Sequence, residues 1–226
     1  MIARVLEPEA MDSPDEAREY DLMDHVSVNA AFVADLLALA ARVGRSLSGT
    51  GFVLDVGTGT ARIPITLCGE DRACKVVGID LAQAMLLVGR QNVAEAALTS
   101  RIALLRARAG ALPFHDASTP VVVSNSLIHH LPDPAAAMKE ACRVAEPGGI
   151  VFIRDLFRPD SRPELDRLVG VHAATATAAQ RQLFADSLHA ALTVDEVRDI
   201  VAALPLSAAS VEATSDRHWT LAATRR

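Results

Sequence analysis

Apolar runs and amphipathic stretches alternate along the middle of the chain. Short apolar runs, each bounded by polar or turn residues, predict buried strands at about 52–56, 75–79, 102–107, 120–123 and 150–154. Helix-compatible segments between them predict helices at about 62–69, 83–97 and 135–144. Strands that alternate with helices predict an α/β fold with a mostly parallel sheet covered on both faces.

Two helices are predicted before the first strand. Ser13, Pro14 and Glu16 mark a helix start, because Ser13 can cap the helix, proline suits its first position and Glu16 completes a capping box. A second helix is expected from about 29 to 43, with Gly44 as its stop. We expect these two helices to form a cap.

The last third of the chain predicts further helices and two strands. Added helices are expected in 162–191, with one apolar face at Leu165, Leu168 and Val169 and another at Leu183, Phe184 and Leu188. A capping box at Thr193 and Glu196 starts another helix, which runs to about residue 204. Strands near 208–214 and 218–224 are expected to complete the sheet as a hairpin.

Together these elements predict a three-layer α/β sandwich. Its sheet is expected to be seven-stranded, mostly parallel and Rossmann-like, with a helical cap. The chain is expected to form a single domain. Its parts are an N-terminal helical cap at 1–48, a cofactor-binding core at 49–155, a helical insertion at 156–192 and a C-terminal helix and strand hairpin at 193–226.

Composition and charge narrow the choice of partners. Half of the 226 residues are hydrophobic, which suits one α/β domain. The net charge is −6, from 22 basic and 28 acidic residues, and no Lys/Arg run appears, so we expect no binding to bulk nucleic acid. No uncharged apolar run reaches the ~20 residues that a membrane span requires.

The cysteines and the N-terminus bear on the compartment. Cys68, Cys74 and Cys142 form no C-x-x-C pair, and no signal-peptide pattern is visible. We therefore expect reduced thiols in a cytoplasmic protein. The sequence leaves a homodimer open.

The first predicted strand leads into a glycine-rich turn that organises the chain. The apolar run ends in Asp55, and Gly57 and Gly59 follow before the next helix. Neither glycine has a Cβ, so the backbone can turn sharply and approach a ligand closely. A turn of this kind between a parallel strand and a helix is typical of nucleotide-cofactor sites.

The spacing around this turn favours one cofactor class. A dinucleotide fingerprint requires a third small residue where Arg62 stands, whereas D-x-G-x-G-x-A fits as Asp55, Gly57, Gly59 and Ala61. An acid at the end of the strand would repel a pyrophosphate but suits a cofactor that carries an ammonium group and a sulfonium. A nicotinamide cofactor remains the alternative.

The stretch from Val53 to Ala61 resembles motif I of the class I S-adenosylmethionine-dependent methyltransferases. Two further segments are similar to the same family: Ser124 to Pro134, after the fourth strand, and R-V-x-x-P-G-G from Arg143. The first of these resembles the ubiquinone and menaquinone methyltransferase branch, with a type 11 methyltransferase domain. These motifs cover about residues 52–155.

The resemblance implies a set of S-adenosylmethionine-binding residues. They are Asp55, Gly57, Thr58 and Gly59 in the turn, Asp80 and Leu81 at the ribose, Met85, Ala109 and Gly110 at the adenine, and Asn125 and Ser126 at the methionine part. Arg108 stands where the family often places an acid, so adenine is expected to be read by backbone groups at Ala109 and Gly110. Alternatively, Asp80 is a helix cap and Met85 is a core residue.

A second set of residues is expected on the acceptor side: His129, His130, His25, Asp155 and Arg158. We expect them to converge on one pocket, because the strand ends open at one edge of the sheet. Adjacent residues rarely point the same way, so one of His129 and His130 is expected to face the acceptor, and no metal site is expected. The alternatives are a packed histidine, an Asp155–Arg158 ion pair, and a solvated helix end at Tyr20 to His25.

These expectations add up to methyl transfer from S-adenosylmethionine to a small-molecule acceptor by in-line displacement. The protein mainly supplies approach geometry and desolvation. A base is needed only when the acceptor must lose a proton, and histidine suits that role near neutral pH. Two alternatives stay open: a nicotinamide-dependent oxidoreductase and a non-catalytic partner subunit with the same fold. The identity of the acceptor, and whether it is O, N, S or C, is left open.

Overall fold

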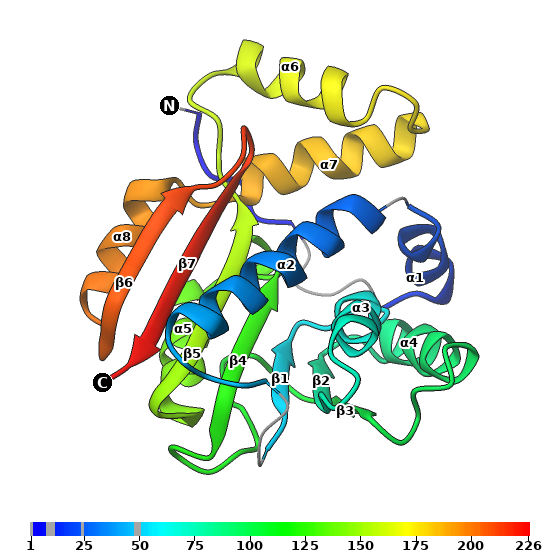
Figure 1. The fold of residues 1–226 in the computed structure, drawn as a ribbon. Coiled ribbons are helices and arrows are strands. Elements are labelled where there is room, and N and C mark those ends of the chain that lie inside the picture. Colours follow the sequence, from blue (N-terminus) through cyan, green and yellow to red (C-terminus); the bar gives the residue numbers. More distant parts are fainter. Residues whose placement is uncertain (1, 8–11, 24, 48–50) are drawn as a thin grey trace.

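A computed structural model describes residues 2–7, 12–23, 25–47 and 51–226. Its centre is a seven-stranded sheet in the order β3-β2-β1-β4-β5-β7-β6 (Figure 1). The strands are β1 (Val53–Val56), β2 (Val76–Asp80), β3 (Ile102–Arg106), β4 (Thr119–Asn125), β5 (Ala145–Leu156), β6 (Leu206–Ala213) and β7 (His218–Arg225).

The sheet is mostly parallel, as the sequence predicts. Strands β1 to β5 pair in parallel, and β7 lies antiparallel between β5 and β6. The last two strands form the expected hairpin. The fold is therefore a Rossmann-like α/β sandwich, and the carboxyl ends of β1, β2, β4 and β5 meet at one edge.

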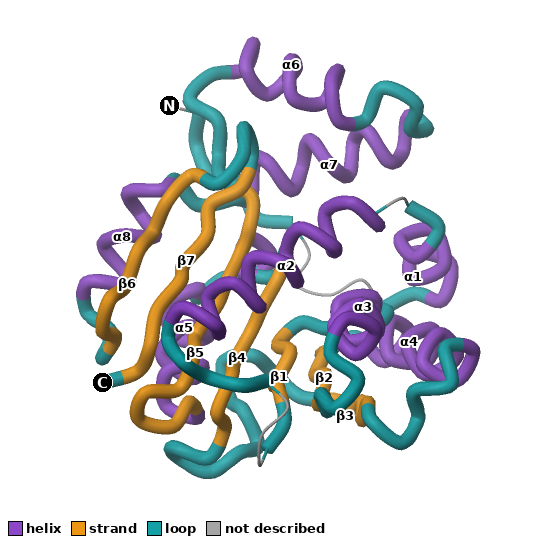
Figure 2. Tube along the Cα trace, viewed as in Figure 1, coloured by secondary structure: helices purple, strands orange, loops and turns teal. Residues whose placement is uncertain are grey.

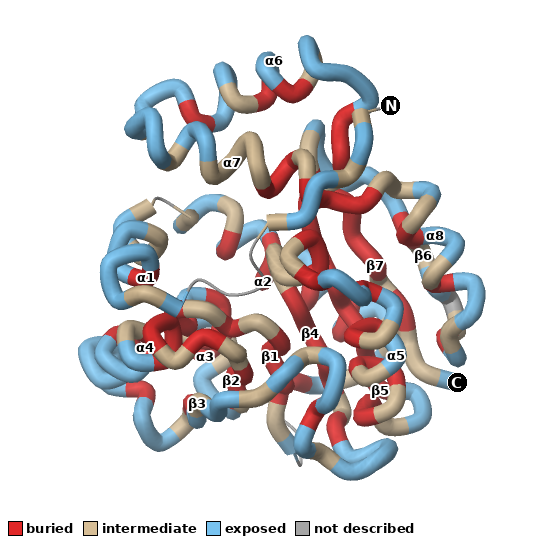
Figure 3. Tube along the Cα trace, turned by 180° about the vertical axis from the view of Figure 1, so that it is seen from behind, coloured by how far each residue is buried: buried red, intermediate tan, exposed pale blue. Residues whose placement is uncertain are grey.

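Helices cover both faces of the sheet and make three layers. Successive side chains of a strand point to opposite faces: on β4, Val121 and Val123 pack in the same cluster as Phe32, whereas Val122 packs with Met138. One face carries α2 (Val26–Arg42), α3 (Arg62–Glu70) and α4 (Gln83–Glu95), and the other carries α5 (Pro134–Val144) and α8 (Val194–Ala202). Figure 3 shows the buried positions concentrated along the strands between these helices.

The remaining helices lie beyond the strand ends. They are α1 (Pro14–Asp21), α6 (Arg162–His172) and α7 (Ala178–Ala190). Figure 2 shows α6 and α7 over the edge at which β4 and β5 finish. The capping boxes at Ser13 and Thr193 are both formed, and Gly44, at φ 68°, ends the segment after α2 as predicted.

Two boundaries differ from the prediction. Strand β5 begins at Ala145 rather than near residue 150, because Ala145 already pairs with Thr119 before the pairing jumps to Ile150 opposite Val121. Helix α2 begins at Val26 instead of residue 29. Among the described residues no single helix is long and apolar enough to cross a membrane; α1 and α2 meet that test only as a pair bent by 76°.

Candidate active site

The glycine turn after β1 is held against β2. The amides of Gly57 and Thr58 both donate to the carbonyl oxygen of Ile79, at 2.9 and 2.8 Å. Gly57 has φ 78° and Gly59 has φ 53°, in the left-handed region that favours glycine. A Cβ on Gly57 would lie 2.8 Å from the side chain of Leu127, so this position has no room for one.

Asp80, at the end of β2, faces the same turn. Its carboxylate accepts hydrogen bonds from the amides of Gly59, at 2.8 Å, and Ala82, at 2.9 Å. Burial raises its pKa, and these backbone donors oppose that rise. Asp80 thus fixes the turn and the residue that precedes α4, but it is not the N-cap of that helix, which is Ala82.

Asp55 is a buried acid beneath the turn. Its side chain is 2% exposed, and its Oδ2 atom has no hydrogen-bond partner among the described residues. Burial raises the pKa of Asp55 to about 7, with Thr58 opposing the rise and Asp80 adding to it. A buried acceptor without a partner costs free energy, which a bound cationic or hydrogen-bonding group would recover.

Strand β4 ends in a strained turn beside the glycine turn. Ser126 has φ 56°, which is unusual for a residue with a side chain. Its amide donates to the carbonyl of Arg154 at 2.9 Å, and the preceding Asn125 has a buried Oδ1 without a partner in the described chain. Strain of this kind is concentrated at functional sites.

Helix α1 closes one side of the site. Asp21 accepts two hydrogen bonds from the guanidinium of Arg62, at 2.9 and 2.6 Å, and one from Asn92 at 2.9 Å. Tyr20 lies beside the glycine turn, with its ring 5.0 Å from the ring of His25. The segment from Tyr20 to His25 therefore lines the site rather than forming a solvated helix end; Asp24 lies outside the described residues.

His129 is the most buried histidine of the site. Its Nδ1 lies 2.5 Å from Oδ1 of Asp155, while Oδ2 of Asp155 accepts from the amides of Ile128 and His129. Burial opposes the charged form of His129, but Asp155 and Glu7 together raise its pKa above the ordinary value. Asp155 thus both orients the imidazole and holds the turn on which it sits.

His130 points in the same direction as His129, against the prediction. Both belong to a 3-10 turn, η1 (Ile128–His130), and their rings stack with centroids 4.1 Å apart. Oε1 of Glu7 lies 3.4 Å from His129 Nε2 and 3.1 Å from His130 Nδ1. The orientation argument against a metal site is therefore wrong, because the tight turn directs both rings toward Glu7.

These elements enclose one cavity of about 460 Å³. Of the predicted residues, those that line it are Asp55, Gly57, Thr58, Gly59, Asp80, Met85, Asn125, Ser126, His25, His129 and His130. Its volume lies within the range that is usual for small-molecule sites. The turn and the acceptor-side histidines therefore share a single space.

The comparisons with known proteins agree with this geometry. Residues 54–153 match the family described as methyltransferase domain. Demethylmenaquinone methyltransferases of Bacillus cereus and Bacillus anthracis are each 38% identical over 107 residues, which are 47% of this chain and 45% of theirs. The matched segment contains both the glycine turn after β1 and the turn after β4, and it makes up less than half of the chain.

Solved methyltransferase structures share the fold over most of the chain. A methyltransferase from Aquifex aeolicus aligns with a TM-score of 0.65 at 18% identity, over 95% of this chain and 99% of that one. Phosphoethanolamine N-methyltransferase 2 of Haemonchus contortus, solved with S-adenosyl-L-methionine, aligns at 0.64 and 17% identity, over 84% and 51%. The same enzyme was also solved with S-adenosylhomocysteine. The match to the curated relatives, however, spans only about half of their length.

Some of the predicted site residues do not line the cavity. Leu81, Ala109 and Gly110 are absent from its walls. Arg158 does not face the pocket, so that prediction is wrong: its guanidinium donates to Ala191 O and Glu196, both at 2.8 Å, and ties β5 to α8. Asp155 acts from behind His129 instead of facing the cavity.

Sequence reasoning assigned no individual residue to several walls of this cavity. Leu183 and Phe184 on α7, His172 on α6 and His218 on β7 line it, as does Leu127. Helical periodicity gives no indication of which face of an added helix meets the site. The sequence also gave Glu7 no role, because its segment has no periodic pattern.

Proposed function

We propose that this protein transfers a methyl group from S-adenosylmethionine to a small, partly apolar acceptor molecule. The supporting observation is that the donor-turn residues and the acceptor-side histidines line the same cavity. S-adenosylmethionine supplies a methyl group on a sulfonium, and transfer is an in-line displacement. The protein holds the two molecules in line and excludes water.

The residues of the turn fit this donor. Gly57 and Gly59 leave the backbone open, and the partnerless oxygens of Asp55 and Asn125 can accept hydrogen bonds from the ammonium group. Asp80 lies where ribose hydroxyls are bound in doubly wound folds. Its carboxylate accepts hydrogen bonds from two backbone amides and has further lone pairs that can accept from ribose hydroxyls. As the resemblance implies, we assign Ser126 to the methionine part of the donor.

The adenine side of the donor is proposed from the resemblance alone. Met85 is buried with Ala82 and lines the cavity, which supports packing against the adenine ring. Leu81 follows Asp80 directly, and Ala109 and Gly110 form the turn after β3 between Arg108 and Ala111. These backbone groups do not line the cavity, so they can bind the adenine only if the donor extends beyond the cavity walls.

The acceptor region has an apolar wall and a polar end. Leu183 and Phe184 of α7 line the same cavity as the histidines. This arrangement suits an acceptor with an apolar body whose reacting atom points toward His25 and His129. The curated relatives are named for demethylmenaquinone, and an apolar ring compound of this general kind fits the same wall.

Two imidazoles are available to remove a proton from such an acceptor. His129 is oriented by Asp155, and His25 lies beside Tyr20 at the edge of the donor turn. Asp155 holds Nδ1 of His129, so this ring would take a proton on Nε2, the nitrogen that lies 3.4 Å from Glu7. An acceptor that reacts without losing a proton would use neither.

We propose a separate role for each of the four segments of the chain. The segment 49–155 carries the donor site, 1–48 and 156–192 cover it from two sides, and 193–226 completes the sheet. We expect the acceptor to enter between the covering segments. Arg158 contributes by holding α8 against β5, not by contacting the acceptor.

The experiment that tests this function is methyl transfer with labelled donor. Purified protein is incubated with S-adenosylmethionine carrying a CD₃ group and a panel of quinols, phenols, amines and thiols, and products are analysed by mass spectrometry. We expect label transfer to an apolar ring acceptor. His25→Asn should reduce it, whereas His115→Asn, at an exposed loop position, should not. Donor binding without transfer to any acceptor class would contradict the proposal.

A further inference from the structure

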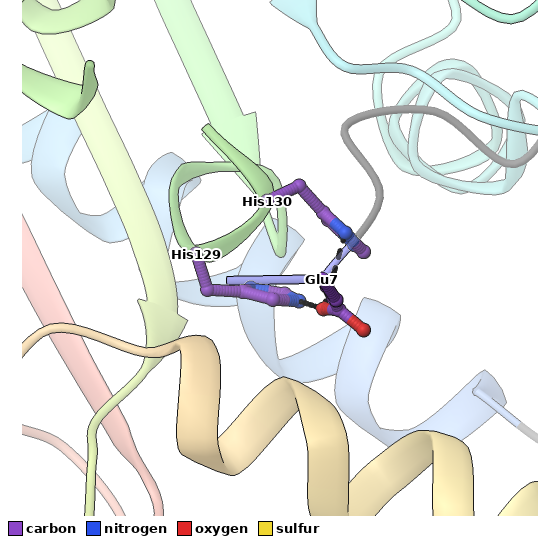
Figure 4. A group of neighbouring side chains, drawn as sticks. All are labelled: Glu7, His129 and His130. Atoms are coloured by element: carbon purple, nitrogen blue, oxygen red, sulfur yellow. Dashed lines mark ion pairs between the residues drawn. The ribbon is translucent and has the colours of Figure 1, made fainter. Parts of the chain in front are cut away.

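We propose that Glu7, His129 and His130 form a binding site for a divalent transition-metal ion of the Zn²⁺ class. The site goes beyond the proposed methyl transfer and does not rest on it. Figure 4 shows the three side chains pointing toward one another, with both imidazoles directed at the Glu7 carboxylate. One ligand atom from each residue lies within 4.8 Å of the other two.

The two separations from Glu7 are close to those around a coordinated ion. A tetrahedral zinc with ligand bonds of about 2.0–2.2 Å holds its ligand atoms roughly 3.3–3.5 Å apart. Oε1 of Glu7 lies 3.4 Å from His129 Nε2 and 3.1 Å from His130 Nδ1. Small side-chain movements would therefore place all three atoms around one ion.

Both ends of the triad have orienting partners, as metal ligands usually do. Asp155 holds Nδ1 of His129 at 2.5 Å, which directs Nε2 toward Glu7. The hydroxyl of Ser187 donates to Oε1 of Glu7 at 3.1 Å. Carboxylate–histidine–metal arrangements use this kind of support to fix the ring and its tautomer.

The segment that carries Glu7 is fastened to the rest of the site. Arg4 donates to the carbonyls of His129, at 3.2 Å, and Leu131, at 3.1 Å, and the amide of Val5 donates to His189 O at 3.1 Å. Residues 4–7 therefore run beside η1 and α7 before any ion binds. Such preorganisation lowers the entropic cost of assembling a site from distant parts of the chain.

The donor set indicates the metal class and an open position. Two imidazoles and one carboxylate suit zinc and other first-row transition ions, and catalytic zinc sites keep three protein ligands with a fourth position free. His129 and His130 also line the cavity, so the free position would face the acceptor space. An occupied site leaves His25 as the imidazole available to take a proton.

The rival explanation is a charged cluster without metal. In that case the side chains of His129, Glu7 and Asp155 share protons, and the triad only fastens the N-terminal segment. The two explanations differ in whether the purified protein binds one metal ion through these residues. They do not differ in donor binding, so failure of the metal site and failure of the proposed function are separable.

The test uses tag-free full-length protein, stripped with a chelator and dialysed at pH 8. Zn²⁺ is titrated by calorimetry, and Co²⁺ is titrated by its visible absorption, which reports ligand number. We expect one ion per chain. Glu7→Gln and His130→Asn should each weaken binding at least 10-fold, and Ser187→Ala, which leaves the ligands intact, should weaken it about 10-fold.

His115→Asn is the matched control, since His115 is an exposed loop histidine remote from the triad in sequence. It should bind metal as the wild type does. Circular dichroism and S-adenosylmethionine binding of each variant establish that it is folded. No stoichiometric binding by the wild type, or equal binding by the wild type and the Glu7→Gln and His130→Asn variants, would overturn the metal site.

Discussion

The guanidinium of Arg62, on α3, forms a two-pronged hydrogen bond with the carboxylate of Asp21, on α1, at 2.9 and 2.6 Å. This contact joins the N-terminal cap to the helix that follows the glycine turn. The Asp21 side chain is only 13% exposed, and Arg62 lowers its pKa against the effect of burial. Arg62, which breaks the dinucleotide pattern in the sequence, thus holds the cap in place.

Loss of this contact should loosen the cap over the donor. Arg62→Ala is expected to weaken S-adenosylmethionine binding about three- to tenfold, mainly through faster release, because a partly exposed pair is worth only about 1 kcal/mol. Stopped-flow fluorescence would give both rates. Arg18→Ala removes only an exposed pair on the same helix and should leave both rates unchanged.

A side chain added at Gly57 should block donor binding for steric reasons. A Cβ on Gly57 would approach Leu127 at 2.8 Å, and the φ of 78° is unfavourable for any other residue. Gly57→Val should therefore abolish detectable donor binding while circular dichroism still shows a folded chain. Gly69→Ala is the control, since a Cβ there meets nothing within 4 Å. Equal loss of binding in both variants would point to general destabilisation.

Asp55 predicts a pH dependence of donor affinity. Its pKa in the donor-free protein is about 7, and a cationic donor favours the ionised carboxylate. Affinity should therefore rise by up to about tenfold per pH unit from pH 5 to 7 and then level off. Calorimetry in buffers of different ionisation enthalpy should show proton release below pH 7. A flat profile in the wild type would exclude this role.

The raised pKa of Asp55 also makes the free energy of unfolding depend on pH. Because the folded-state pKa is raised above the unfolded value of 3.8, Asp55 stabilises the fold below about pH 4, and this contribution is lost as the pH rises through 7. Asp55→Asn should thus become more stable relative to the wild type between pH 4 and 8, by up to about 4 kcal/mol. Urea unfolding at both pH values measures the difference; an unchanged difference would contradict the burial argument.

A substitution at Arg108 tests whether backbone groups, rather than this side chain, bind the adenine. If backbone groups at Ala109 and Gly110 bind the adenine, Arg108→Ala should change donor affinity by less than about 1 kcal/mol, the size of one modest hydrogen bond. The measurement is a calorimetric titration with S-adenosylmethionine. A hundredfold loss would mean that the arginine itself contacts the donor.

Local patterns carried most of the fold prediction. Apolar runs placed the strands, capping boxes at Ser13 and Thr193 placed helix starts, and the acid and glycines after β1 placed the donor turn. Each of these signals lies within a few residues of the feature that it predicts. This is why the sheet and the glycine turn followed from the sequence.

The acceptor side depended on contacts between distant segments. The direction of His130 follows from η1, which Asp155 of β5 holds through its hydrogen bonds to Ile128 and His129. Glu7 reaches these rings only because Arg4 binds carbonyls of the same turn. No pattern within one segment encodes such contacts, so the convergence of both imidazoles on Glu7 was not predicted.

The most direct test of the central claim is a parallel calorimetric titration of the protein with S-adenosylmethionine and with NADH. We predict one S-adenosylmethionine per chain, bound by the wild type and lost in Asp55→Ala, with no measurable NADH binding. Circular dichroism of the variant establishes that it is folded. Stoichiometric NADH binding, or S-adenosylmethionine binding that Asp55→Ala leaves unchanged, would contradict the assignment of the donor site.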